Sequence, residues 1–266
     1  MESSPGIGKR RPDTITRLGQ SEQPVQKIFA DVDLKTNPDR QPKVIMKMPE
    51  EITAALGGDG LVVKSHNINI ETKDLHRLTG ENWLNDKIIE LYLKMISDRS
   101  STDVYRREKL PKVYAMSSYF FENLMNRGTT AVEKWTKDVD IFEFDLILVP
   151  IHLSDHWCLA VVDFRSPGVF YYDSLGGRNM PALSLILGYL KVEYKRKGKA
   201  ELDIEKFAKE IVQDCPKQDN GWDCGVFVCK VAEFLSRNVT PRFSQQDMPF
   251  FRKLMFDEII MKRLLT

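Results

Sequence analysis

Three apolar stretches between residues 144 and 173 constrain the fold of this chain more than any other feature. They cover residues 144–151, 156–164 and 169–173, and each has the length of a strand. Strands that are apolar on both faces are typical of the middle of a sheet that is covered on both sides. The residues between them, 154–155 and 165–168, include Ser, Asp, Pro and Gly, which favour turns. Because short turns join antiparallel neighbours, the pattern predicts a central, mostly antiparallel sheet.

Helical patterns occur on both sides of this block in the sequence. Asn85 or Asp86 can cap a helix through residues 87–93, which has apolar residues at helical spacing. Residues 202–215 fit a helix in part, but Pro216 would end it, and their structure stays open. The other expected helices cover residues 119–124, 181–195, 225–235 and, from a capping box of Ser244 and Asp247, residues 244–265. The chain is therefore assigned to the α+β class, with helices flanking the central sheet.

The composition of the chain changes near residue 44. Residues 1–44 carry Gly, Pro, Ser and charged residues with few large apolar ones, so we expect a mobile, disordered polar leader. Within it, residues 8–12 form a short basic cluster that could belong to a nuclear address. Residues 45–266 keep a high apolar density without internal repeats, so we expect a single domain there.

Charge and hydropathy exclude several classes of protein. Lys and Arg together number 39 and Asp and Glu 38, and the resulting net charge of +1 provides no general attraction for nucleic acid. No apolar run approaches the ~18 residues that a membrane span requires. The first residues also lack the apolar region of a secretory signal. We therefore expect an intracellular protein that neither binds nucleic acid nor inserts into a membrane.

Cysteine and histidine are scarce, with four of each in the chain. Four cysteines are too few for a disulfide scaffold, and we expect free thiols in a reducing compartment. His152 and His156 have the spacing that binds zinc on a helix, but Pro150 and residues 154–155 predict a turn at this place. We therefore expect neither a metal nor another cofactor.

Cys224 differs from the other cysteines in its position. It follows a turn-forming Asn-Gly pair and stands at the start of an expected helix, where unpaired backbone N–H groups carry partial positive charge. That field favours the thiolate, which is the nucleophilic form of cysteine. Gly225 would let the backbone of a substrate approach closely. Cys158 and Cys229 fall within apolar segments and are expected to pack in the core.

His156 and Asp173 are the candidate base and its orienting partner. His156 opens the second expected strand and Asp173 closes the third, so a hairpin between them brings both to the same end of the sheet. A turn centred between Phe164 and Arg165 would set the two residues directly opposite each other. A turn centred slightly later, on residues 167–168, would shift the register by one or two residues.

Acyl transfer also requires a hydrogen-bond donor for the oxyanion. Gln218 lies six residues before Cys224 in the same loop, and its side-chain amide could serve together with the backbone N–H of Cys224. Its neighbours Lys217, Asp219 and Asn220 could do the same, so position alone favours Gln218 only weakly.

Five segments occur in a characteristic order: Trp83-Leu84-Asn85-Asp86, Pro150–Leu153, His156–Asp163, Tyr171–Gly177 and Gln218–Gly225. Together they resemble the ubiquitin-like-protein-specific cysteine proteases, in particular the SUMO-specific (sentrin-specific) branch. The resemblance spans about residues 47–266, and its order of His, Asp, Gln and Cys differs from that of papain. The segment 243–252 resembles the SUMO-specific branch more than the NEDD8-specific one.

The resemblance implies an adenain-like cysteine-proteinase fold, with residues 45–266 as the catalytic domain. It implies that Cys224 is the nucleophile, that His156 is the general base and acid, and that Asp173 orients the histidine. Gln218 would be the oxyanion donor. In this reading the reaction needs no cofactor.

Two tryptophans are expected to contact the substrate. In the family, indole rings at the positions of Trp83 and Trp157 cover a narrow tunnel that admits only the Gly-Gly tail of the modifier, and we add His152 to the expected substrate-binding residues. From the residues alone, Trp83 could equally be a core anchor beside its helix. Trp222 and Leu175 depart from the family pattern, and both could alter access near the cleft.

The implied function is that of a SUMO-specific thiol protease that removes SUMO from lysines and matures SUMO precursors. Its expected partners are SUMO and SUMO-conjugated proteins. We expect a monomer located in the nucleus or at the nuclear envelope. Three alternatives stay open: a protease for NEDD8 or another ubiquitin-like modifier, an acyltransferase on the same fold, and a modifier-binding adaptor without turnover.

Overall fold

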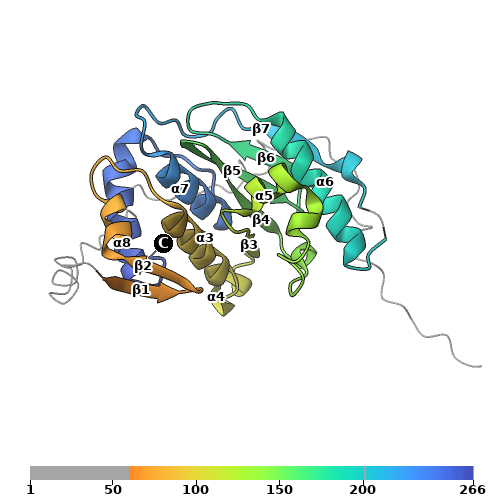
Figure 1. The fold of residues 1–266 in the computed structure, drawn as a ribbon, viewed down its shortest axis with the longest axis horizontal. Helices are drawn as coiled ribbons and strands as arrows, with labels where there is room; N and C mark the ends of the chain where they lie inside the picture. Colours follow the sequence, from red (N-terminus) through yellow and green to blue (C-terminus); the bar gives the residue numbers. More distant parts are fainter. Residues whose placement is uncertain (1–59, 201, 266) are drawn as a thin grey trace, which may run out of the picture. The chain divides into compact units, whose positions relative to one another are not determined.

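A computed structural model describes residues 60–200 and 202–265 of the chain. Within these residues the strands form a two-stranded sheet and a five-stranded sheet, and helices pack on the larger one (Figure 1). The expected polar leader at 1–44, its basic cluster and the domain start at residue 45 lie outside the described residues. No helix of the described part is long and apolar enough to cross a membrane.

The five-stranded sheet consists of β3 (Val113–Ala115), β4 (Leu146–Leu153), β5 (His156–Asp163), β6 (Gly168–Tyr172) and β7 (Ala208–Ile211), in that order. The three central strands pair antiparallel, as the apolar stretches and their turns predict. The edge strands β3 and β7 pair in parallel with their neighbours, so the sheet is mixed. The fold class predicted from the sequence, α+β with a central antiparallel part, is confirmed.

The β5–β6 hairpin turns over residues 164–167, slightly later than the midpoint between His156 and Asp173. With this register, Asp173 lies one step beyond the last pair of the ladder and opposite Cys158, two residues from His156. Residues opposite each other on antiparallel strands point to the same face, as do residues two apart on one strand. The three side chains therefore share one face at the end of the sheet.

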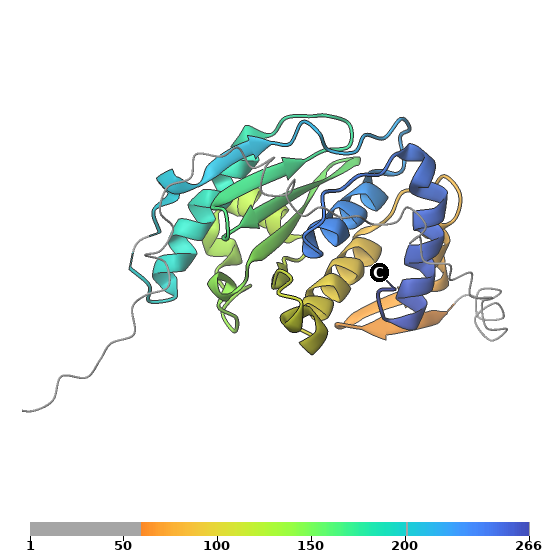
Figure 2. The same cartoon turned by 180° about the vertical axis from the view of Figure 1, so that it is seen from behind.

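Helices cover both faces of the sheet (Figures 1 and 2). The long helices are α3 (Asp86–Ser100), α5 (Phe120–Arg127), α6 (Met180–Arg196), α7 (Cys224–Ser236) and α8 (Met248–Met261). Helices α3 and α7 pack on one face, with α8 against both of them, and α5 and α6 pack on the other. The smaller elements are β1 (Leu61–Ser65), β2 (Ile68–Glu71), α2 (Thr72–Leu75) and α4 (Asp103–Arg107). The β1–β2 hairpin contacts α3 and α8 rather than the main sheet.

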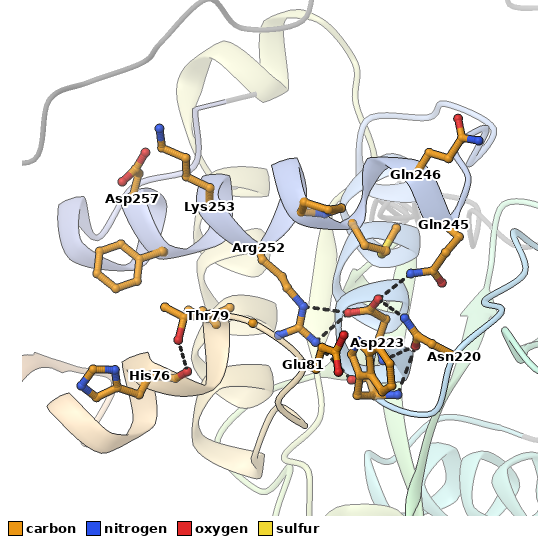
Figure 3. A pocket seen from close by; sticks show the side chains of 16 residues that line it. His76, Thr79, Glu81, Asn220, Asp223, Gln245, Gln246, Arg252, Lys253 and Asp257 are labelled. Atoms are coloured by element: carbon orange, nitrogen blue, oxygen red, sulfur yellow. Dashed lines mark hydrogen bonds and ion pairs between the residues drawn. The ribbon is translucent and has the colours of Figure 1, made fainter.

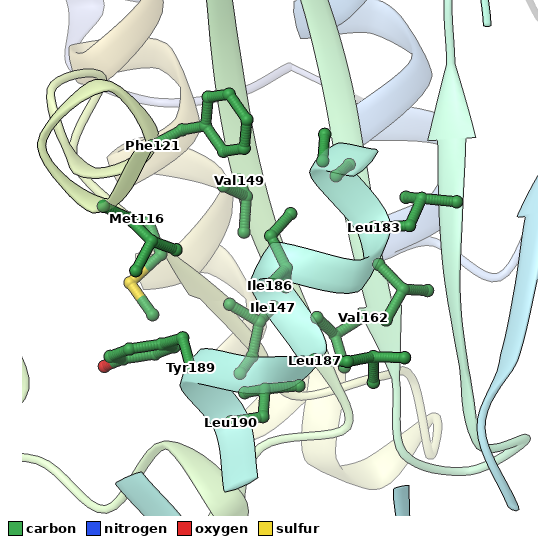
Figure 4. Packing of buried hydrophobic residues seen from close by; sticks show 14 of the residues in the cluster. Met116, Phe121, Ile147, Val149, Val162, Leu183, Ile186, Leu187, Tyr189 and Leu190 are labelled. Atoms are coloured by element: carbon green, nitrogen blue, oxygen red, sulfur yellow. The ribbon is translucent and has the colours of Figure 1, made fainter. Parts of the chain in front are cut away.

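The main hydrophobic core lies between the sheet and α5 and α6 (Figure 4). Alternate residues of the strands, such as Ile147, Val149 and Val162, point toward Leu183 and Ile186 of α6, and all five are buried. Burial of apolar surface contributes about 25 cal/mol per Å². This packing makes the sheet a rigid support for the polar residues at its end.

Helix α7 is almost completely buried, as its apolar sequence predicts, although it carries two charged residues. Lys230 donates to the hydroxyl of Tyr92 at 2.7 Å, and this hydroxyl donates to Glu258 of α8 at 2.7 Å. Glu233 accepts hydrogen bonds from Arg99 of α3 and from Arg237. These partners compensate the buried charges and attach α7 to α3 and α8.

The region 202–215, left open by the sequence, contains the edge strand β7 rather than an α-helix. Its apolar residues fit helical spacing, but pairing with β6 satisfies the backbone instead. The expected capping box of Ser244 and Asp247 is present. It precedes a single short turn at Gln245–Asp247, and α8 then ends at Met261, before the expected end of the helix.

Candidate active site

The amino end of α7 presents Cys224 at the base of a cleft. The carbonyl of Asp223 accepts the backbone N–H groups of Val226 at 2.8 Å and Phe227 at 3.0 Å, so Cys224 is the first residue of the helix. The partial positive charge of this helix end favours a thiolate. Cys224 is thus both a helix start and a lining residue of the cleft.

The other three cysteines are unsuited to nucleophilic chemistry. Cys158, Cys215 and Cys229 are buried free thiols. Burial raises the pKa of each of them, to about 12 for Cys215. At neutral pH these side chains therefore stay protonated.

His156 and Asp173 form a hydrogen-bonded pair at the end of the sheet. The distance between His156 Nε2 and Asp173 Oδ1 is 2.8 Å. The hydrogen bond to Asp173, followed by those to Cys158 and Cys224, raises the pKa of His156 well above its ordinary value. Burial opposes the charge of Asp173, but the hydrogen bonds from His156 and the backbone of Leu175 outweigh it and lower the pKa of this carboxyl group. The pair therefore favours an imidazolium next to a carboxylate.

The turn after β6 holds the carboxylate of Asp173 in place. Its Oδ1 also accepts the backbone N–H of Leu175 at 2.8 Å, and its carbonyl accepts the ammonium group of Lys217 at 3.0 Å. Gly176 adopts a positive φ of 79°, a conformation that glycine adopts without strain. A Cβ atom at Gly177 would collide with Asp173 Oδ2. Glycine is therefore required at position 176 by the backbone conformation and at position 177 by the space that Asp173 occupies.

Gln218 is buried in the loop before α7. Its Oε1 accepts the hydroxyl of Ser174 at 2.6 Å, and its Nε2 donates to the carbonyl of Asn220 at 2.6 Å. An amide NH₂ group has two donors, so one remains for an oxyanion. The loop thus orients the Gln218 amide through two neighbours, and Asn220 is one of the residues that the sequence had left as an alternative donor.

The cleft that reaches Cys224 has a volume of about 350 Å³. Its lining includes Trp83, Trp157 and His152, the three residues expected to bind substrate. Trp83 is 46% exposed, which excludes the alternative of a core anchor. Trp157 is buried, and its ring stacks on His152 with 4.2 Å between the ring centroids. Flat aromatic rings therefore bound the path to the sulfur atom.

Side chains hold the carbonyl groups of three successive residues, of which Trp83 and Leu84 line the cleft. Arg252 donates to the carbonyl of Asn82 at 2.8 Å, and Arg77 donates to that of Trp83 at 3.1 Å. Trp157 Nε1 donates to the carbonyl of Leu84 at 3.2 Å. The next residue, Asn85, caps α3 by accepting the N–H of Ile88 at 3.2 Å, so it is Asn85 rather than Asp86, of the two caps left open by the sequence, that begins this helix. Each of residues 82–85 is therefore held in position by at least one side-chain hydrogen bond.

The structure explains the glycine at position 225 differently from the sequence, which suggested that it lets a substrate backbone approach. A Cβ atom at this position would lie 2.9 Å from Leu84 Cβ and 3.2 Å from Ile89 Cδ1. Its missing side chain makes room for Leu84 rather than for a substrate backbone. The glycine thus brings the helix of Cys224 against the segment that carries Trp83.

The alternation of the β4–β5 hairpin separates the two histidines that had zinc spacing. His152 pairs with Trp157, whereas His156 pairs with Leu153, so the histidine side chains point to opposite faces. Among the described residues, His156, Cys158 and Asp173 could hold a metal ion, because their ligand atoms lie within 4.8 Å of one another. A metal would need a deprotonated thiol at Cys158, which its raised pKa disfavours.

The sequence analysis included Asp223 and Arg252 in the segments 218–225 and 243–252 but gave neither residue a role and did not pair them. Both side chains are buried, and Arg252 Nε donates to Asp223 Oδ1 at 2.7 Å. A buried charge requires a partner, but the sequence cannot pair two residues that lie 29 positions apart. Trp222 lines a second cavity rather than the cleft of Cys224.

Comparison with known proteins identifies relatives across most of the chain. A sentrin-specific protease of Caenorhabditis elegans is 44% identical over 204 residues, which are 77% of this chain and 29% of that protein. Mouse sentrin-specific protease 2 is 36% identical over 223 residues, which are 82% of this chain and 37% of that protein. The chain therefore spans about a third of the length of these relatives.

The fold has a similar counterpart among solved structures. The C-terminal Ulp1 protease domain of yeast, solved in complex with Smt3, the yeast ortholog of SUMO, has a TM-score of 0.67 and 29% identity to this chain. The match covers 80% of this chain and 93% of that domain. Residues 82–264 also match the model of the Ulp1 protease family, C-terminal catalytic domain. The chain belongs to the Ulp1 protease family.

Proposed function

We propose that this chain is the catalytic domain of a SUMO-specific thiol protease that cleaves after the C-terminal Gly-Gly of the modifier. It would release SUMO from the lysines of conjugated proteins and mature SUMO precursors. The observation that carries the proposal is the His156–Asp173 hydrogen bond of 2.8 Å, because His156 also interacts with Cys224, the residue that an aromatic-lined cleft reaches. The names of the relatives, sentrin-specific proteases and a SUMO-bound protease domain, support SUMO as the modifier.

The reaction begins at the sulfur of Cys224. The thiolate attacks the carbonyl carbon of the terminal glycine, and the carbonyl electrons move onto the oxygen. The backbone N–H of Cys224 and the free donor of the Gln218 amide then stabilise the oxyanion. His156 protonates the leaving amine, which is a lysine side chain in a conjugate or an α-amine in a precursor.

The second half of the reaction regenerates the enzyme. His156, now neutral, removes a proton from a water molecule that attacks the thioester and becomes imidazolium again. The C–S bond then breaks, and its electrons stay on the sulfur of Cys224, so the thiolate and the imidazolium are restored. Asp173 keeps the imidazole ring oriented and stabilises its charged form throughout. Each step uses side chains of this chain, and no metal or organic cofactor is required.

The aromatic cleft accounts for the expected preference for glycine. Trp83 and Trp157, with His152 stacked beside the latter, line the approach to Cys224. A tail without side chains fits between flat rings, whereas a larger residue would have to displace them. We propose that these three residues bind the extended tail of the modifier.

A SUMO probe with a C-terminal electrophile tests the assignment. The chain should form a covalent adduct with this probe, and Cys224→Ser should abolish the adduct and lower turnover by roughly a thousandfold or more. Side-by-side kinetics on SUMO, NEDD8 and ubiquitin substrates should favour SUMO. Labelling that persists in Cys224→Ser would contradict the nucleophile, and faster cleavage of NEDD8 or ubiquitin would contradict the substrate.

The remaining expectations concern the molecule in the cell. We propose that the protein acts in the nucleus or at the nuclear envelope, on the basis of the basic cluster at residues 8–12, and, as a separate expectation, that it acts as a monomer. Fluorescence microscopy of the full chain, compared with a variant in which Lys9, Arg10 and Arg11 are replaced by Ser, measures the contribution of that cluster. Equal nuclear fractions would contradict it.

A further inference from the structure

The second cavity is lined in part by the loop that precedes Cys224 and has a volume of about 650 Å³. Its lining combines η3 (His76–Leu78) and the residues after it, the loop at 220–223, and helix α8. Figure 3 shows Arg252 reaching from α8 across this cavity toward Asp223. The cavity thus exposes a junction where three separate parts of the chain meet.

Asp223 is the most heavily hydrogen-bonded carboxylate of this junction. Its Oδ1 accepts a hydrogen bond from Arg252 Nε at 2.7 Å and lies 2.6 Å from Arg252 Nη2 in the same ion pair. Its Oδ2 accepts the side-chain amides of Asn220 at 2.7 Å and Gln245 at 2.6 Å. Because Asp223 directly precedes Cys224, these bonds hold the last loop residue before the sulfur (Figure 3).

The guanidinium of Arg252 also holds the opposite wall of the cleft. Its Nη1 donates to the carbonyl of Arg77 at 2.8 Å, and its Nη2 donates to that of Asn82 at 2.8 Å and that of Trp222 at 3.2 Å. Asn82 precedes Trp83, which lines the path to Cys224. One buried side chain therefore contacts the loop of Cys224 and the segment of Trp83.

We propose that Arg252 is a positioning residue that sets the distance between Trp83 and Cys224. The inference rests on the proposed function, because it assigns Arg252 a part in the same reaction. A buried ion pair contributes little net stability compared with well-packed apolar residues. The planar fork of arginine, however, can donate to several fixed acceptors at once, which lysine cannot do. The geometry of Arg252 is therefore suited to specifying where two segments lie.

Two substitutions separate the two contacts. Arg252→Lys keeps a positive charge near Asp223 but cannot reach the carbonyl groups of Arg77, Asn82 and Trp222 together. It should raise KM, because the segment of Trp83 is no longer held, and lower kcat, because the catalytic loop is loosened. Asp223→Asn leaves the bonds of Arg252 to Arg77 and Asn82 in place. It replaces one carboxylate oxygen by an NH₂ group, which cannot accept, so it weakens the bonds that the loop makes through Asp223 to Arg252, Asn220 and Gln245. It should lower kcat and leave KM within about twofold.

The measured quantities are kcat and KM on a fluorogenic SUMO substrate, well below the melting temperature of each variant. For Arg252→Lys we expect kcat/KM to fall by roughly tenfold to a hundredfold, as for a shift of reacting groups by up to 1 Å. Lys253→Gln is the matched control, since Lys253 is an exposed neighbour on the same helix and lines the same cavity. It should retain the kcat and KM of the unmodified chain.

The rate of Cys224 alkylation by iodoacetamide, followed by mass spectrometry, provides a readout that does not depend on SUMO. It should fall in Arg252→Lys and Asp223→Asn and stay unchanged in Lys253→Gln. If the unmodified chain does not cleave SUMO, the proposed function fails, while the alkylation rates still test Arg252. Folded Arg252→Lys protein with unchanged kcat, KM and alkylation rate overturns the inference. If Arg252→Lys does not fold, an unchanged kcat and alkylation rate of Asp223→Asn overturn it.

Discussion

Replacing Gly225 by alanine tests whether the helix of Cys224 is positioned by contact with Leu84. Two effects of opposite sign follow from the structure. Alanine is a better helix former than glycine by up to about 1 kcal/mol. Its Cβ would lie 2.9 Å from Leu84 Cβ, however, and both residues are buried. Such overpacking costs typically about 1–3 kcal/mol, so we expect a net loss of stability of up to about 2 kcal/mol.

Gly188 provides the matched control for this substitution. It lies within helix α6, and an added Cβ would meet nothing within 4 Å. Gly188→Ala should therefore raise the free energy of unfolding by about 0.5–1 kcal/mol. The difference between the two variants isolates the contact with Leu84, because both gain the same type of helix propensity. Urea denaturation measures it, provided that the m-values of the variants agree.

Activity should respond to Gly225→Ala more strongly than stability does. Leu84 must retreat by about half an ångström to reach an ordinary contact distance, and its neighbour Trp83 lines the cleft. A displacement of this size lowers kcat/KM by roughly tenfold, whereas Gly188→Ala should leave it unchanged. The reasoning is refuted if Gly225→Ala is as stable as Gly188→Ala and cleaves SUMO substrates at the rate of the unmodified chain.

Three further substitutions test the neighbouring parts of the site. Asp173→Asn removes the largest cause of the raised pKa of His156, so the imidazolium loses its proton at a lower pH. The alkaline limb of a kcat/KM–pH profile should therefore move to lower pH. An alkaline limb at the same pH would contradict the pairing of His156 with Asp173. Gly177→Ala should push on the carboxylate of Asp173 and lower kcat with little change in KM, measured by steady-state kinetics. Trp157→Phe leaves the buried carbonyl of Leu84 without its donor and should lower the free energy of unfolding, measured by urea denaturation, by about 1–3 kcal/mol. It should also raise KM, and an unchanged KM would argue against contact between Trp157 and the substrate.

Local patterns in the sequence were sufficient for most of the secondary structure. Apolar runs of strand length predicted β4, β5 and β6, and the expected helix boundaries agree with α3, α5, α6 and α7 to within a few residues in most cases. Residues 202–215 show where such reasoning ends, because an apolar pattern that fits a helix forms the edge strand β7. Pairing with β6 decides this segment, and a pairing partner cannot be read from the segment itself.

For the candidate site too, the sequence indicated some features and the structure supplied the others. The sequence singled out Cys224 by its place at a helix start, and His156 and Asp173 by their places at strand ends. The structure brings the latter two within 2.8 Å, and their catalytic roles remain a proposal. The resemblance to the SUMO-specific proteases carried the family assignment, which the comparisons confirm.

By itself, then, the sequence determined the central antiparallel strands and which side chains could be reactive, because both depend on short-range patterns. Only the tertiary structure decided the register of the β5–β6 hairpin, the exposure of Trp83 and the buried contacts of Arg252. These properties arise from residues that are distant in sequence. Pairing a buried charge or filling the space beside a glycine depends on which segments meet, and packing alone determines that.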